Sequence, residues 1–400
     1  MLIPFYALGA LLLIFRGDWI LRLKKHWQSL LDEAQDCRLI CWLRGIPFLR
    51  LLDALIIAVL VLICLHGTDV PDFRNYQTAY SRMSLGIPYS YLGRGWYVLM
   101  NIGLTLGMSY AQVRAVLALF CLLALSSTAD YYRSSDRGKL MFWGLYMIFP
   151  ALLDFTQIRF FCAIAFVIYA FRWLDDFSIR NCFLYAFFTL LGALIHSSAL
   201  LYLALLLVHL FRRFPKSMSA AVTGITLCAV LFREPLIHLG SALIRSDRLE
   251  RYILQGSPIG SFGLLFTAAF SAGICLLLLM QLRLLDREYP GRIRRTPSRA
   301  PLSEIRIRKG LYTALGVNVL LCGVIALSRL DANFFRLERP GWIFFIMISS
   351  SICSLSADKR FSRPKKTADW LWAALLLLAV AANLYFISLF TFPLVLGYLG

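Results

Sequence analysis

A short polar segment at residues 65–80 carries the first side chains that could do chemistry. It reads LHGTDVPDFRNYQTAY and follows an apolar run. Its two carboxylates, Asp69 and Asp72, are candidates to accept a proton or to bind a sugar hydroxyl. Gly67, Pro71 and the aspartates also suit a simple turn, which is the structural alternative.

Aromatic side chains are frequent in this segment and just after it. They are Tyr76, Tyr80, Tyr89, Tyr91 and Trp96. Such rings offer apolar faces on which sugars can stack, and they also form the aromatic belt at a membrane surface. We assign Tyr76, Trp96 and the neighbouring Arg94 to sugar binding.

Two further candidates stand between apolar runs. Arg159 lies in DFTQIRFF, where an arginine can bind an anion or extend to the lipid headgroups. His196 lies in ALIHSSAL, where an imidazole can act as a general base near neutral pH or serve as a hydrogen-bond partner in helix packing. His196 is our first choice for the proton acceptor.

Arginines also recur in two later segments and are candidates to bind phosphate, because the planar guanidinium suits it. Arg251 belongs to SDRLERY, and Arg329 and Arg336 belong to RLDANFFRLERP. In the second segment, pairing with Asp331 and Glu338 is the structural alternative. The ten cysteines show no metal-binding or redox spacing, so we expect neither a metal nor a cofactor.

The elements that position these residues must be membrane helices. Of the 400 residues, 60% are apolar and 16% are charged, whereas soluble proteins average about 45–50% and about 25%. These values exclude disordered, coiled-coil and small secreted classes. Continuous apolar runs without period-two alternation predict helices. The expected fold is all-α, a polytopic integral membrane protein of about 12 transmembrane helices in one domain over 1–400.

The predicted spans are near 1–15, 48–66, 110–129, 140–154, 159–174, 181–195, 198–211, 219–232, 261–282, 311–328, 341–356 and 369–391. Residues 18–36 are expected to form an amphipathic helix on the inner membrane surface. Residues 67–109 are expected to form an outer loop, in which 96–108 is a re-entrant or surface-lying helix.

Positive charge sets the orientation. With the N-terminus outside, the inner segments 16–50, 131–139, 172–180, 212–217, 283–309 and 357–368 hold 7, 3, 2, 3, 9 and 5 of the Lys and Arg residues, which is 29 of 41. This agrees with the positive-inside rule. Residues 283–309 then form a basic cytoplasmic loop, and the candidate side chains gather at the outer pole. The net charge of +19 follows from topology, so no nucleic-acid partner is expected.

In these segments the chain resembles the EpsG-type, Wzy-like bacterial polysaccharide polymerases. The resemblance runs across roughly residues 1–360, in a fixed order along an apolar scaffold. It is carried by Gly67, Thr68, Asp69 and Tyr76, by Gly95 and Trp96, by Ile158 and Arg159, by His196 to Leu200, by Glu250 to Tyr252, and by Arg329 to Arg336.

Two departures from the family pattern change the expected roles. Many family members look like E-P-G-Y where this chain has Gly-Arg-Gly-Trp at 93–96, so a carboxylate is missing there. They also tend to carry glutamine where this chain has Phe160. The first departure moves the role of proton acceptor to Asp69, Asp72 or His196.

The resemblance implies an enzyme that joins oligosaccharide repeat units carried on undecaprenyl pyrophosphate, at the periplasmic face of the bacterial inner membrane. For this reaction we expect Arg159, with Arg329 or Arg336, to stabilise the charge of the pyrophosphate leaving group without a metal, and we assign Arg251 to pyrophosphate binding as well. The expected partners are the lipid-linked glycan, membrane lipids, and a chain-length regulator and a flippase of the same pathway.

Two other functions fit the same residues. A lipid-linked glycan flippase or transporter would also need cations for the pyrophosphate, although the chain shows no matching halves with broken helices. A membrane O-acyltransferase would use His196 as a base on a sugar hydroxyl. A purely structural scaffold leaves the outer arginines unexplained.

Overall fold

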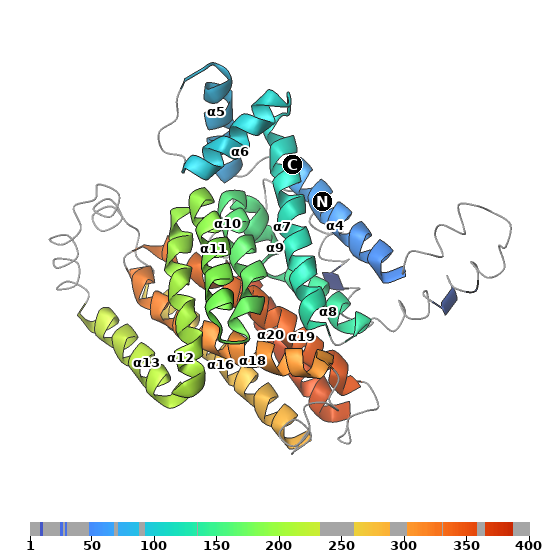
Figure 1. The fold of residues 1–400 in the computed structure, drawn as a ribbon, viewed down its shortest axis with the longest axis vertical. Coiled ribbons are helices and arrows are strands. Elements are labelled where there is room, and N and C mark those ends of the chain that lie inside the picture. Colours follow the sequence, from blue (N-terminus) through green and yellow to red (C-terminus); the bar gives the residue numbers. More distant parts are fainter. Residues whose placement is uncertain are drawn as a thin grey trace. The chain divides into compact units, whose positions relative to one another are not determined.

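The computed structural model describes residues 9–10, 25–26, 29, 48–67, 71–87, 93–133, 135–232, 260–288, 302–329, 331–357 and 365–386. Every regular element within these ranges is a helix, which confirms the all-α fold (Figure 1). The α-helices are α4 Phe48–His66, α5 Pro71–Ser84, α6 Arg94–Thr105, α7 Tyr110–Tyr132, α8 Asp136–Ile148, α9 Ala151–Thr156, α10 Ile158–Ala170, α11 Ile179–Ile195, α12 Val208–Arg213, α13 Pro215–Leu231, α16 Ser261–Glu288, α18 Leu302–Leu321, α19 Arg339–Ala357 and α20 Lys365–Phe386. The 3-10 helices are η1 Phe171–Leu174, η2 Ser197–Leu207, η4 Cys322–Arg329 and η5 Ala332–Glu338.

Three helical stretches among the described residues are long and apolar enough to cross a membrane. They are Tyr110–Tyr132, Ser261–Asp286 and Glu304–Ser328. Shorter apolar helices are Ile179–Ile195, Pro215–Leu231 and Trp370–Tyr385. The chain is therefore a membrane protein, while the count of about twelve spans stays a prediction.

Several predicted spans match one helix closely, whereas others are divided between two helices or are partly 3-10 helical. The span predicted at 48–66 is α4. The span predicted at 140–154 is broken into α8 and α9, because Phe149, which precedes Pro150, adopts an extended backbone. The span predicted at 198–211 is mostly the 3-10 helix η2. Most of the interfacial helix predicted at 18–36 lies outside the described residues.

The predicted outer loop at 67–109 contains two short helices, and both precede α7. α5 is polar and buries Phe73, Ala79 and Tyr80. α6 occupies the place where we expected a re-entrant or surface-lying helix. α7 then begins at a capping box, in which Ser109 and Gln112 exchange side-chain and backbone hydrogen bonds.

The helices divide into two compact units, each described by itself. The first comprises Met1–Tyr169, Leu190–Ala199 and Ser350–Gly400, and the second comprises Ala170–Thr189 and Leu200–Ser349. The prediction of a single domain over 1–400 is not tested by this division and stays a prediction.

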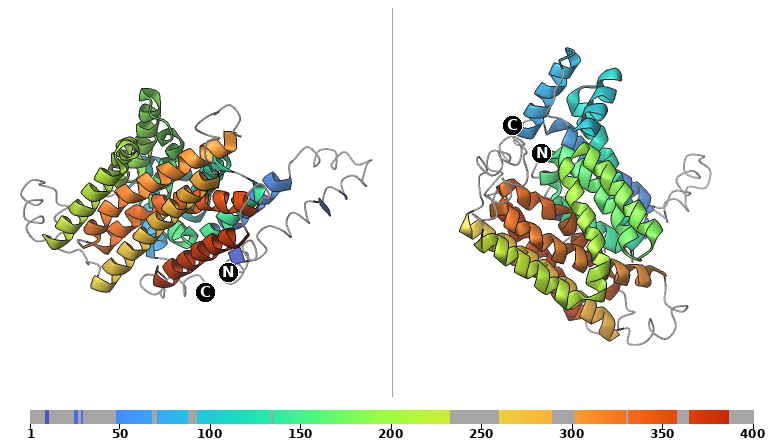
Figure 2. Two further views of the ribbon diagram at one scale, coloured as in Figure 1. Left: turned by 90° about the horizontal axis from the view of Figure 1, so that it is seen from below. Right: turned by 60° about the vertical axis from the view of Figure 1, so that its left-hand side comes forward.

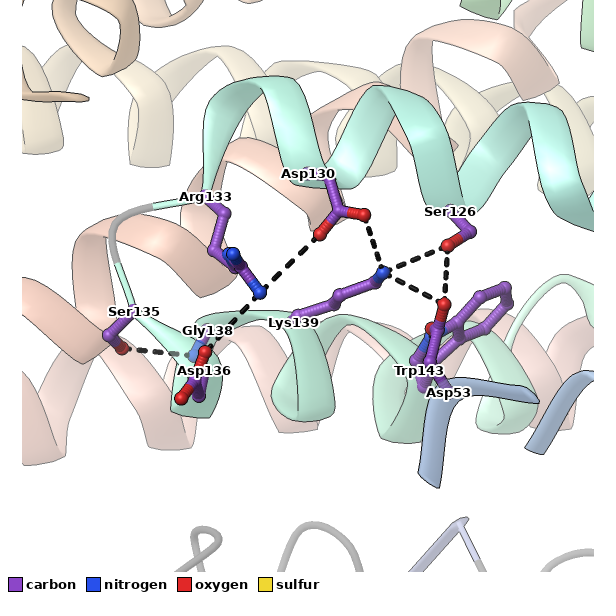
Figure 3. A network of polar contacts seen from close by, with 9 residues as sticks. All are labelled: Asp53, Ser126, Asp130, Arg133, Ser135, Asp136, Gly138, Lys139 and Trp143. Atoms are coloured by element: carbon purple, nitrogen blue, oxygen red, sulfur yellow. Dashed lines mark hydrogen bonds and ion pairs between the residues drawn. The ribbon is translucent and has the colours of Figure 1, made fainter. Parts of the chain in front are cut away.

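In the first unit α4 lies against α7 (Figure 1). A buried polar network joins these two helices to α8 (Figure 3). The Lys139 Nζ atom donates to Asp53 Oδ2 at 2.9 Å, to Ser126 Oγ at 2.8 Å and to Asp130 Oδ2 at 2.9 Å. Trp143 Nε1 donates to Asp53 Oδ1 at 2.7 Å. Lys139, which we counted among the loop cations, is therefore buried and fully engaged by its three partners.

In the second unit α16 runs beside α18 (Figure 2). Polar pairs also connect the helices of this unit. Gln281 exchanges hydrogen bonds with Ser349 at 3.0 and 3.1 Å, and the Thr313 hydroxyl donates to Asp175 at 2.7 Å. These buried polar groups thus find partners on neighbouring helices instead of facing lipid.

Candidate functional site

A buried arginine fixes the end of α4, just before the predicted catalytic aspartates. Arg114 of α7 is 1% exposed. Its Nη2 atom donates to the Gly67 carbonyl at 2.6 Å and to the Cys64 carbonyl, and its Nε atom donates to Cys64 Sγ at 3.3 Å. Its guanidinium carbon lies 4.9 Å from the centre of the Phe73 ring. Arg114 therefore connects α7 to both ends of the segment that carries Asp69.

Of the two candidate aspartates, only Asp72 lies within the described residues. Asp69 lies outside the described residues. Asp72 is half-buried in the first turn of α5 and lies within electrostatic range of the Tyr110 hydroxyl. Asp72 is thus close to the aromatic side chains at the start of α7.

An aromatic cluster joins α5, α6 and α7. The Tyr76 ring lies 5.5 Å from Trp96 and 6.5 Å from Tyr110, and Tyr110 lies 5.1 Å from Phe73. Trp96 is fully buried, while Tyr76 is half-buried. Arg94, at the first position of α6, is exposed. The structure therefore brings two of the predicted sugar-binding residues, Tyr76 and Trp96, into contact.

Arg159 lies at the start of α10, against the turn that ends α11. Its Nε atom donates to the Ile195 carbonyl at 2.9 Å. A Cβ atom added at Gly93 would lie 3.1 Å from Arg159 Nη2. A Cβ atom added at Gly95 would lie 2.8 Å from the carbonyl carbon and oxygen of Leu194. Glycines at these two positions therefore let the start of α6 approach Arg159 and the end of α11.

His196 lies in the break between α11 and η2. Its Nδ1 atom lies 2.7 Å from Ser198 Oγ and accepts from the Ser198 backbone N–H at 3.4 Å. Because a backbone N–H can only donate, this contact favours the neutral tautomer with its hydrogen on Nε2. Phe160 packs edge-on against the imidazole at 5.4 Å. In this arrangement His196 presents a donor at Nε2, and a base role there requires the other tautomer.

The predicted site residues fall into three groups. In the first unit lie Asp72, Tyr76, Arg94, Trp96, Arg159 and His196. In the second unit lie Arg329 and Arg336. Outside the described residues lie Asp69 and Arg251. Within the first unit, the start of α6 lies between two groups of candidates. Its glycines lie against Arg159 and the end of α11, which precedes His196, and its Trp96 belongs to the aromatic cluster.

In the second unit, polar residues gather around η5. The Tyr202 hydroxyl donates to the Leu337 carbonyl at 2.9 Å, and Tyr202 lies within electrostatic range of Arg336 and Arg339. Ser271 Oγ donates to Glu338 Oε2 at 2.5 Å. Burial raises the pKa of Glu338, which lies outside the three apolar stretches, well above its ordinary range.

We considered ion pairs of Asp331 and Glu338 with the arginines of this segment, but both carboxyl groups accept hydrogen bonds from neutral donors. The Asp331 carboxylate caps η5 by accepting from the Asn333 backbone N–H at 2.7 Å. Glu338 accepts from Ser271, as described above. Arg339, which follows Glu338, is 1% exposed. The segment thus buries two ionisable side chains, Glu338 and Arg339, that its sequence alone does not mark as buried.

Sequence reasoning missed Tyr110, Arg114 and Arg339 as candidates. The signal for Arg114 was present, because an ionisable residue inside an apolar span is costly and is a functional candidate for that reason. Tyr110 carried no such signal, since a tyrosine at the end of a span is typical of the aromatic belt.

These features define a membrane protein, all-helical over its described residues, in which the buried Arg114 of α7 and a cluster of aromatic rings contact the segment before α7. The family model described as the EpsG family matches residues 51–396. The chain therefore belongs to the EpsG family, which confirms the resemblance seen in its sequence and points to polysaccharide biosynthesis by a polymerase. No curated protein and no solved structure matches the chain.

Proposed function

We propose that this protein polymerises undecaprenyl-pyrophosphate-linked oligosaccharide repeat units into a surface polysaccharide. The reaction is a metal-independent glycosyl transfer at the periplasmic face of the bacterial inner membrane. The family match over residues 51–396 is the observation that carries this proposal. The charge bias of the predicted loops supports the orientation.

In the proposed reaction, a hydroxyl oxygen of one repeat unit attacks the anomeric carbon of the growing chain. The bond between that carbon and the phosphate oxygen breaks, and the lipid diphosphate leaves with the electron pair. Arginine donors stabilise the charge that develops on the leaving group. Arg159 suits this role because its Nε atom is anchored on Ile195, which orients the guanidinium. The same role, stabilising the charge on the leaving diphosphate, is proposed for Arg251, Arg329 and Arg336.

The attacking hydroxyl must lose its proton. We assign the proton to one of three groups, Asp69, Asp72 or His196. The Ser198 contact favours a donor at Nε2 of His196, so in this tautomer the imidazole donates to a substrate oxygen and an aspartate takes the proton. Tyr76, Trp96 and Arg94 are proposed to bind the sugars.

The test combines gene deletion with single substitutions. Deletion should replace the ladder of long chains on a gel by single capped repeat units. Arg159→Ala should do the same while the protein remains in the membrane, and Arg159→Lys should recover little, because a point charge does not reproduce the guanidinium fork.

Unchanged long chains after deletion contradict the proposed function. Repeat units that accumulate on the cytoplasmic side would instead favour a flippase. Wild-type chain lengths in Arg159→Ala would remove Arg159 from the site but leave the polymerase function standing.

A further inference from the structure

Three buried polar groups near the start of α7 have no hydrogen-bond partner among the described residues. They are Trp96 Nε1, Tyr110 Oη and Arg114 Nη1. The three side chains are 0%, 3% and 1% exposed. Buried donors without partners are rare in folded proteins, because each loses its water without compensation.

The three groups share one neighbourhood within the first unit. Tyr110 and Arg114 are one helical turn apart on α7, so they lie on the same face. Both contact Phe73, with the Tyr110 ring at 5.1 Å and the Arg114 guanidinium at 4.9 Å. Trp96 reaches the same place through Tyr76, which contacts both Trp96 and Tyr110. The unused donors are thus arranged around aromatic rings.

The charge of Arg114 indicates the kind of group that would satisfy these donors. Within the described residues its guanidinium contacts two backbone carbonyls, one thiol and an aromatic ring, and all of them are neutral. Among the described residues no carboxylate lies within ion-pair distance of it; Asp72 is within electrostatic range of the adjacent Tyr110. A buried cation whose contacts among the described residues are all neutral is costly, so a negatively charged group would be stabilised there.

We propose that Trp96, Tyr110 and Arg114 bind an oxyanion carried on a sugar of the lipid-linked glycan. This inference rests on the proposed function and adds Tyr110 and Arg114 to the substrate site. Arg114 Nη1 and the Tyr110 hydroxyl donate to the oxyanion, Trp96 Nε1 donates to a neighbouring sugar oxygen, and Tyr76 covers the sugar ring. The oxyanion is either the sugar-linked phosphate or the carboxylate of an acidic sugar.

Tyr110→Phe is the decisive substitution, because it removes a hydroxyl that has no partner within the described protein. It should leave the melting temperature unchanged or slightly raised. It should weaken ligand binding about 10-fold to 100-fold, which is the loss of one hydrogen bond to a charged group. The matched control is Tyr185→Phe in the second unit. The Tyr185 hydroxyl donates to the Tyr202 carbonyl at 2.7 Å, so its loss should lower the melting temperature and leave binding unchanged.

Binding is measured on the full chain in nanodiscs with three probes: a short polyprenyl diphosphate, the same diphosphate carrying one neutral sugar, and free glucuronate. Weaker binding of the sugar diphosphate alone assigns the site to the sugar-linked phosphate. Weaker binding of glucuronate alone assigns it to a carboxylate.

Unchanged binding of all three probes by Tyr110→Phe overturns the inference, and so does a wild-type protein that binds none of them. Failure of this inference is distinguishable from failure of the proposed function. In the first case, a strain carrying Tyr110→Phe makes a wild-type ladder while the deletion strain makes none. In the second case, the ladder persists in the deletion strain itself.

Discussion

Replacing Lys139 tests whether the buried network in Figure 3 holds the first unit together. In Lys139→Met the carboxylate of Asp53, whose side chain is 16% exposed, loses its cation. Removing one partner of a buried ion pair costs about 3–5 kcal/mol. The value here should be somewhat lower, about 2–4 kcal/mol, because Asp53 keeps the donors Ser126 at 2.6 Å and Trp143 at 2.7 Å. The bond to Asp130, which is 46% exposed, adds little.

The assay is an unfolding titration with SDS in mixed micelles, which yields the change in the free energy of unfolding. Lys309→Met is the matched control, since Lys309 pairs with Asp176 at 2.7 Å with side chains 41% and 61% exposed. That substitution should cost less than about 1 kcal/mol. Equal effects of the two substitutions would refute the reasoning that burial makes the Lys139 network important.

A double substitution separates the charge effect from the loss of packing. Asp53→Asn combined with Lys139→Met removes both charges at once. If the cost of Lys139→Met comes from an unpaired carboxylate, the double variant should be more stable than the sum of the two single effects predicts, by about 1–2 kcal/mol. Strict additivity would assign the loss to packing instead.

Two further predictions concern backbone approach and proton binding. Gly95→Ala should destabilise the protein by about 1–3 kcal/mol and shorten the polysaccharide, because the added Cβ atom would lie 2.8 Å from the Leu194 carbonyl group. The control is Gly224→Ala in α13, where an added Cβ atom has nothing within 4 Å. This control should be neutral or stabilising in the same titration. Burial raises the pKa of Glu338, so the folded state binds its proton more tightly than the unfolded state, and stability should fall as the pH rises from the ordinary glutamate range through the raised pKa. Melting temperatures of wild type and Glu338→Gln between pH 5 and 9 check this, and a decline of the same slope in the variant would contradict it.

The limits of prediction from the sequence are clearest where helices break. The boundaries of α4 followed from its apolar run alone. The break between α8 and α9 was also readable, since Pro150 disfavours a helical conformation at Phe149. The 3-10 geometry of η2 was not readable, because Ser197–Leu207 is as apolar as an ordinary span and has no proline or glycine. Apolar composition predicts that a segment is buried but does not distinguish these two helix types.

The candidate site shows a similar division between residue types and contacts. The sequence selected Tyr76, Trp96 and Arg159 by chemical type, and the structure places all three around the start of α6. It did not reveal that Arg114 holds the end of α4, because that contact joins residues about fifty positions apart. The sequence also led us to count Lys139 among the cations of an inner loop, although its side chain is buried among partners from two other helices.

The start of α6 gives the first departure from the family pattern, the missing carboxylate at 93–96, a physical consequence. Gly93 and Gly95 permit the start of α6 to approach Arg159 and Leu194 closely. A carboxylate side chain in place of Gly93 would lie beside the Arg159 guanidinium. Such a carboxylate would pair with Arg159 and compete with an anionic substrate for it. Its absence therefore leaves Arg159 to the diphosphate in the proposed reaction. For the same reason, replacing the exposed Arg94 by an acid in Arg94→Glu should weaken binding of a polyprenyl diphosphate. The neutral control Arg94→Gln should weaken this binding less. Equal binding by both variants would show that charge at the start of α6 does not affect the substrate.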